Sequence, residues 1–130
     1  MITAVHALIY SDDAPATRAF FRDVLELPFV SDDESQDTDG WLIFATGPSE
    51  VGVHPTAGEH GGETFTAPKH HQVSFMVEDV EAAASRLRAK GATITTGPAD
   101  LGFGIGIEVA VPGTDALLIY QPKHATTHHA

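Results

Sequence analysis

Eight histidines and no cysteine set the chemistry that this chain can carry out. Without cysteine there is no thiolate nucleophile, no disulfide and no cysteine-bound metal. Any metal must be held by histidine, carboxylate or amide groups, and imidazole can also carry protons near neutral pH. His6, His54 and Gln72 lie in short runs that are typical of β-strands. The chemistry therefore depends on which of these side chains the strands bring together.

Alternation along the strand-like runs predicts one face that mixes polar and apolar side chains. Residues two apart on a strand share a face, and the opposite face of these runs is continuously apolar, which suits packing beneath helices. A mixed face fits a ligand cleft, because apolar walls supply affinity and a few polar atoms fix orientation. The alternative is a collapsed interior that Leu118 and Phe103 fill. We predict a cleft lined by His6, Leu8, Tyr10, Trp41, Ile43, Gly52, His54, Gln72, Ser74, Phe103, Leu118 and Tyr120.

The first half of the chain predicts a strand, a helix and a hairpin. Residues 2–10 are apolar and β-rich, and Asp13 then caps a helix over residues 13–27 that Pro28 ends. Residues 31–40 are acidic and lack periodicity, which favours a solvated hairpin loop. Runs at 41–46 and 50–54 flank a Gly-Pro-Ser turn and predict a second hairpin.

The same order of elements returns in the second half. A strand at 71–77, a helix at 79–90 and strands at 93–96, 105–111 and 116–121 are expected, with Gly91 stopping the helix. The capping aspartates Asp13 and Asp79 are 66 residues apart (79 − 13 = 66), and His6 and Gln72 each stand seven residues before them. This register indicates an internal duplication. We predict one domain over residues 1–130, with halves at 1–56 and 70–122, a linker at 57–69 and a tail at 123–130.

Two segments carry a family resemblance. His-Ala-Leu-Ile-Tyr-Ser-Asp-Asp at residues 6–13, followed by Phe-Phe-Arg-Asp-Val-Leu at 20–25, resembles the opening of the vicinal-oxygen-chelate superfamily of glyoxalases, bleomycin-resistance proteins and extradiol dioxygenases. Residues 75–81 are similar to its second strand-to-helix signature, although Glu26 stands where the family usually has glycine. The resemblance implies an α+β fold in which two βαβββ modules form an open, curved mixed β-sheet barrel with the helices outside. It also implies a homodimer.

The resemblance further implies four metal-ligand positions, which here are His6, Gly52, Gln72 and Leu118. Only the histidine and the glutamine can donate to a metal, whereas such a site needs at least three protein ligands. The family's metal set is therefore expected to be incomplete, and a divalent metal is not favoured. The alternative is a displaced set of His6, Gln72, His54 and Glu50, in which a two-residue step moves a donor by roughly 6.6 Å along its strand.

Two functions follow from these observations. In the first, the protein binds a small aromatic or amphipathic molecule between its halves without a metal, as bleomycin-resistance proteins do. In the second, it is a metal-dependent lyase, isomerase or extradiol-type dioxygenase that uses the displaced ligand set. The residues alone leave open whether the protein is an enzyme.

Charge and hydropathy exclude other partners. A formal net charge of −11 repels phosphate backbones and anionic lipid head groups. No segment reaches the roughly 20 apolar residues that span a bilayer. We therefore expect a cytoplasmic protein that binds neither nucleic acid nor membranes.

The alternating glycines at 102, 104 and 106 are not followed by a helix, so we expect the start of a strand that leaves room in the cleft instead of a phosphate loop.

Overall fold

The computed structural model describes residues 7, 9, 11–31, 42–50, 56–68 and 71–125. Helix α1, Ala14–Ala19, begins at Asp13, whose carboxylate accepts a hydrogen bond from the amide of Ala16 at 3.2 Å. This contact confirms the predicted cap, because a side-chain oxygen satisfies one of the amides that a helix start leaves free. The helix continues as the π-helical turn η1, Phe20–Val24.

The first helix ends earlier than the sequence predicts. Glu26, not Pro28, turns the chain, with a left-handed φ of 58°. Its carboxylate contacts the guanidinium of Arg86 and lies 2.6 Å from the Nζ atom of Lys90, both in the second half. A side chain with these contacts explains why a position that favours glycine by its backbone holds glutamate here.

A small antiparallel sheet follows. Strand β1, Phe29–Ser31, pairs with β2, Leu42–Phe44, so that Phe29 lies opposite Phe44. The pairing agrees with a hairpin around the acidic stretch, although the loop itself lies outside the described residues. Of the predicted strand at 50–54, only Glu50 is described.

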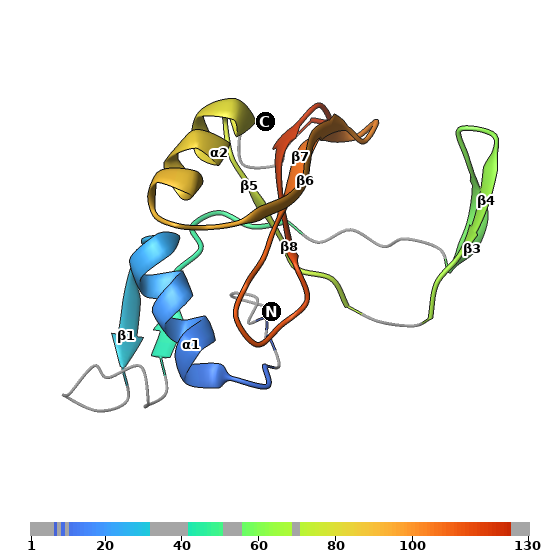
Figure 1. Cartoon of the computed structure of the whole chain (residues 1–130). Coiled ribbons are helices and arrows are strands. Elements are labelled where there is room, and N and C mark those ends of the chain that lie inside the picture. Colours follow the sequence, from blue (N-terminus) through green and yellow to red (C-terminus); the bar gives the residue numbers. More distant parts are fainter. Residues whose placement is uncertain are drawn as a thin grey trace.

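The segment predicted as a linker contains a β-hairpin. Strand β3, Ala57–His60, pairs antiparallel with β4, Glu63–Thr66, across a turn at Gly61 and Gly62. Both glycines have positive φ, which a tight hairpin turn requires. Glycine frequency pointed to a loop because the short polar strands around the turn carry no apolar alternation. In Figure 1 the hairpin stands off on the side of the main sheet opposite the helices.

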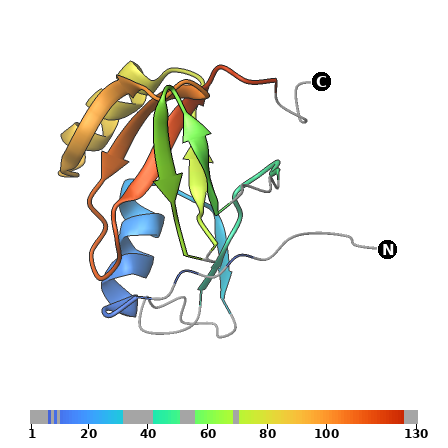
Figure 2. The same ribbon diagram turned by 90° about the vertical axis from the view of Figure 1, so that its right-hand side faces the viewer.

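The second half forms one complete βαβββ module. A four-stranded mixed sheet has the order β5-β8-β7-β6, with β5 parallel to β8 and the other pairs antiparallel. Figure 2, turned by 90°, shows this sheet behind the hairpin. The elements are β5, Ser74–Met76; α2, Val80–Ala89; β6, Ile94–Asp100; β7, Gly104–Val109; and β8, Leu117–Pro122.

Helix α2 confirms the second predicted cap and stop. The Asp79 carboxylate accepts from the amide of Ala82 at 3.1 Å, and Gly91 has a φ of 89°. The amide of Val80 also donates to the side chain of Gln121 at 3.1 Å, which attaches the start of the helix to β8. The two aspartates that defined the internal repeat therefore begin two corresponding helices.

One core lies between the helices and the four-stranded sheet. Helix α2 packs on β6, β7 and β8. Phe21 of η1 makes edge-to-face contacts with Phe44 and Phe75, with ring centroids 5.5 and 6.0 Å apart. The first half thus contributes aromatic side chains to a core that the second half builds. The buried members are Phe20, Phe21, Val80, Ala84, Leu87, Ile107, Val109, Val111, Leu117 and Ile119.

A second connection joins the start of α1 to the turn between β7 and β8. Thr17 is only 6% exposed, and its hydroxyl contacts the Pro112 carbonyl and lies 2.7 Å from the Ser11 hydroxyl. The amide of Asp12 donates to the carbonyl of Gly113 at 2.8 Å. These bonds hold the first helix against the strand pair that carries the candidate site.

The architecture confirms the predicted fold class. Helices lie outside mixed and antiparallel sheets, and the described strands do not close into a barrel. Within the described part of the chain, no helix is long and apolar enough to cross a membrane.

Candidate functional site

Strand register divides the four-stranded sheet into two faces. Ser74 lies beside Leu118, and Gly106 lies beside Tyr120, whereas the alternate positions Phe75 and Ile119 enter the core. We call the side away from the helices the open face. It carries Ser74, Met76, Leu101, Phe103, Glu108, Leu118 and Tyr120.

Two glycines of β7 let large side chains lie close to the sheet on the open face. A Cβ atom added at Gly106 would lie 2.7 Å from Leu101 Cδ1 and 3.1 Å from Leu118 Cδ1. One added at Gly104 would lie 2.7 Å from the Tyr120 ring. Leucine and tyrosine therefore use the space that the glycines leave. A strand does start at Gly104, as predicted, but the chain's own atoms occupy the space next to Gly104 and Gly106.

An aromatic pair remains accessible at one end of the open face. Phe103 is 46% exposed and Leu101 is 37% exposed, which is high for large apolar side chains. The Phe103 and Tyr120 rings meet edge to face at 5.2 Å and 84°. Such a pair offers a further aromatic group both a ring face and a ring edge.

Polar groups gather around the Tyr120 hydroxyl. This oxygen lies 3.0 Å from His124 Nε2, and the Glu50 carboxylate lies 3.9 Å from the same nitrogen. Burial, and then the negative charge of Glu50, raise the pKa of Tyr120, so the phenol keeps its proton well above neutral pH. Tyrosine, histidine and glutamate thus come from β8, the segment after it and the segment after β2.

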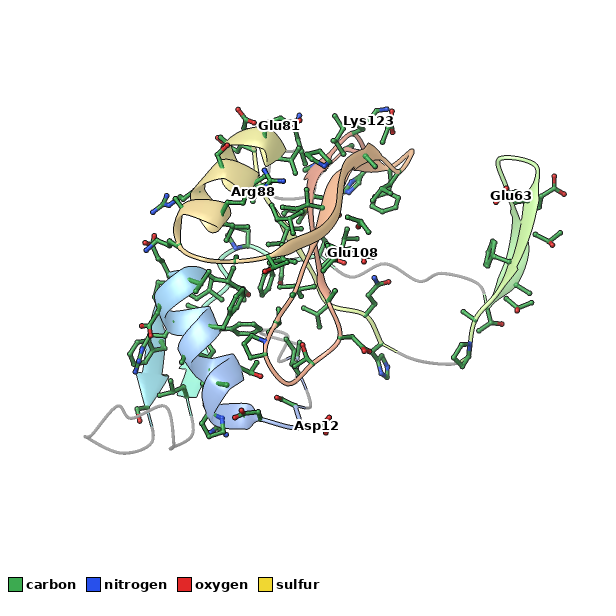
Figure 3. The ribbon with its side chains drawn as sticks, in the orientation of Figure 1. Asp12, Glu63, Glu81, Arg88, Glu108 and Lys123 are labelled. Atoms are coloured by element: carbon green, nitrogen blue, oxygen red, sulfur yellow. The ribbon has the colours of Figure 1, made fainter. Side chains whose placement is uncertain are left out.

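The segment after β8 is held in place on both sides of the histidine. The Lys123 amide donates to the Phe103 carbonyl at 2.8 Å, and Lys123 Nζ lies 2.9 Å from the Asp100 carboxylate. His124 Nδ1 lies 2.8 Å from the Ala125 carbonyl. Figure 3 shows Lys123 at the end of the sheet where β6 and β7 meet. His124 is therefore part of the fold, not of a loose tail.

The structure locates about half of the predicted site residues. Ser74, Phe103, Leu118 and Tyr120 lie on the open face. Ile43 is in the separate β1–β2 sheet and 36% exposed. The other described candidates are Gln72, exposed just before β5, and Glu50, near His124. The remaining candidates, His6, Leu8, Tyr10, Trp41, Gly52 and His54, lie outside the described residues.

Two of the four predicted metal-ligand positions, Gly52 and Leu118, have no side-chain donor atom. Leu118, at one predicted ligand position, packs its methyl group over Gly106 and has no donor atom. A second position is Gly52, which has no side chain. Among the described residues, no three His, Asp or Glu side chains are grouped as metal ligands. Glu50 and Gln72 remain candidates whose predicted partners, His6 and His54, are not described.

Sequence reasoning missed His124. It was assigned to the tail because the residues around it are polar and lack strand alternation. One signal was available: it stands four residues after Tyr120, immediately beyond a strand that was already placed on the cleft face. A short turn there returns the side chain toward the strand's own hydroxyl.

Sequence and fold comparisons now identify the class of protein. Residues 3–116 match the Glyoxalase/Bleomycin resistance protein/Dioxygenase superfamily, and the chain belongs to this family. No curated protein matches it in sequence.

Two solved structures share the fold. One is TnmS3, an antibiotic-binding protein from Streptomyces sp. CB03234, with a TM-score of 0.59 and 16% identity over 95% of this chain and 100% of that one. The other is an integron cassette protein from the mobile metagenome of V. cholerae, with a TM-score of 0.50 and 16% identity over 93% and 98% of the two chains. At this identity the likeness shows the fold alone.

Proposed function

We propose that the protein binds a small aromatic or amphipathic molecule against the open face, without the family's metal. The observation that carries the proposal is the accessible aromatic pair of Phe103 and Tyr120, next to the polar groups of His124 and Glu50. An apolar wall with a few fixed polar atoms is the usual composition of a small-molecule site. TnmS3, which shares the fold, is an antibiotic-binding protein, so this fold can serve small-molecule binding without that likeness identifying the ligand.

A fluorescent aromatic probe tests the proposal. We expect 2-methoxynaphthalene to bind the protein and to raise its melting temperature, because a ligand of the native state stabilises that state. Phe103→Ala should weaken binding about two- to tenfold, the range for loss of an aromatic contact. Val30→Ala is the matched control, since Val30 is 63% exposed but lies on β1, away from the open face. Equal loss in both variants would show that binding is not at this face.

Metal analysis separates the proposal from the enzyme alternative. A metal-free binding protein should keep its affinity for the probe after treatment with a chelator. Near-stoichiometric metal in natively purified protein, lost in His6→Ala, would instead support a lyase, isomerase or dioxygenase built on His6, Gln72, His54 and Glu50. That result would overturn the metal-free assignment.

We also propose that the chain is a cytoplasmic homodimer and that its two halves, residues 1–56 and 70–122, form one domain. Family membership supports the dimer, and the aromatic contacts between the halves support the single domain. Light scattering on purified protein tests the first, with a monomer mass as the contradicting result. A single cooperative unfolding transition tests the second.

A further inference from the structure

Hydrogen-bond geometry determines which nitrogen of the neutral His124 ring carries the proton. A carbonyl oxygen can only accept, so the 2.8 Å contact with the Ala125 carbonyl places a proton on Nδ1. In the neutral ring Nε2 is then unprotonated and accepts. The Tyr120 hydroxyl, 3.0 Å away, must donate to it. The single phenolic proton is thus directed at the histidine, and the lone pairs of the Tyr120 oxygen face elsewhere.

Near Tyr120, the open face therefore presents hydrogen-bond acceptors to a ligand. The Tyr120 oxygen can accept, and a hydrogen bond that it already donates polarises it and strengthens it as an acceptor. The Glu50 carboxylate, which lies 3.9 Å from the same imidazole nitrogen, also only accepts. The raised pKa of Tyr120 keeps the phenolic proton in place for donation to His124. Lys123, next to His124 in the sequence, is paired with Asp100 at 2.9 Å.

We propose that Tyr120, oriented by His124, selects aromatic ligands that carry a hydrogen-bond donor, such as a phenolic hydroxyl, on the ring that packs against Phe103. This inference rests on the proposed function and names the chemical class of its ligand. Tyr120 contacts the ligand in this inference. His124 is a positioning residue that holds the Tyr120 phenolic proton away from the ligand.

A matched pair of probes tests the selection. 2-Naphthol and 2-methoxynaphthalene share a ring system, but only the first can donate a hydrogen bond. The wild-type protein should bind 2-naphthol about two- to tenfold more tightly, the value of one net hydrogen bond. Tyr120→Phe keeps the ring and removes the acceptor, so the ratio of the two dissociation constants should fall to about one. Thr95→Val, which removes an exposed hydroxyl on β6, should leave the ratio unchanged.

The positioning role of His124 has its own readout. In His124→Ala the Tyr120 proton is free to donate, so affinity for 2-methoxynaphthalene, whose ether oxygen accepts, should rise relative to that for 2-naphthol. Nitrogen-15 NMR of the His124 imidazole in the wild-type protein, at slightly alkaline pH, should show the Nδ1-protonated tautomer. The other tautomer would overturn the orientation on which the selection depends.

The outcomes also separate this inference from the proposed function. Binding of both probes with equal affinity, unchanged by Tyr120→Phe, would overturn the selection and leave the binding function standing. Binding of neither probe would overturn both. A preference that survives Tyr120→Phe would place the acceptor elsewhere and would also contradict the inference.

Discussion

Replacing Thr17 by valine should destabilise the protein by about 2 kcal/mol. Valine has nearly the same shape, so the change removes the hydroxyl without opening a cavity. Thr17 is 6% exposed, and its hydroxyl satisfies the Pro112 carbonyl and lies 2.7 Å from the Ser11 hydroxyl. Pro112 is exposed and Ser11 half-buried, so each of the two lost hydrogen bonds costs about 0.5–1.5 kcal/mol net, which gives about 2 kcal/mol together. In a chain of this length, 2 kcal/mol lowers the melting temperature by roughly 6–8 °C.

Urea unfolding followed by circular dichroism measures this change. The midpoint should fall while the slope with denaturant stays constant, because the variant exposes the same surface on unfolding. Thr95→Val is the control: it removes a hydroxyl that bonds to a backbone carbonyl at 3.2 Å, but at an exposed position. It should stay within about 0.5 kcal/mol of wild type. If the two variants lose the same stability, the bond between α1 and the β7–β8 turn contributes no more than a surface hydrogen bond.

Three further predictions follow from the described contacts. Gly113→Ala should cost about 2 kcal/mol or more by urea unfolding, because its φ of 84° is left-handed and an added Cβ would lie 2.7 Å from the amide of Asp13; a stability equal to wild type would contradict this. Glu26→Gln should reduce stability at neutral pH but not in acid, because the hydrogen bond from Lys90 lowers the pKa of Glu26 and its stabilisation is lost as the pH falls below the ordinary value of 4.5. With the only other tyrosine replaced, the phenolate absorbance of Tyr120 should titrate above the ordinary 10.0, and Glu50→Gln should bring that midpoint down. For a group of raised pKa the folded state holds its proton longer, so the contribution of Tyr120 to stability is constant below this range and is lost as the pH rises through it.

Local rules were enough to predict the fold where a single side chain determines an element's boundary. Asp13 and Asp79 cap their helices through bonds that depend only on residues three positions away. The alternation that placed Leu118 and Tyr120 on one face, and Phe75 on the other, also follows from strand geometry alone. The end of the first helix could not be found in this way. Glu26 adopts a left-handed conformation while its carboxylate meets Arg86 and Lys90, about sixty positions away in sequence.

The candidate site depends even more on contacts between distant segments, which local rules cannot predict. Strand periodicity identified Tyr120, but the groups that give this tyrosine its chemistry come from outside any strand. His124 reaches its hydroxyl because the Lys123 amide bonds to the Phe103 carbonyl, a contact between segments that no periodicity relates. Glu50 was considered only as a displaced metal ligand. Its effect here is on the pKa of Tyr120, through a distance that exists only after folding.

Leu118, at a position where the family resemblance implies a metal-binding carboxylate, also takes part in the packing of the open face. Its methyl group lies close above the backbone of Gly106 together with that of Leu101. A carboxylate at position 118, as close to Leu101 as the Leu118 methyl group is, would lose much of its hydration. Only a metal or a hydrogen-bond donor could offset that free-energy cost. With leucine there, the surface instead gains apolar contacts with Leu101 and the Gly106 backbone. The polar chemistry is then concentrated at Tyr120, where the hydroxyl, imidazole and carboxylate can be arranged by hydrogen bonds and charge alone.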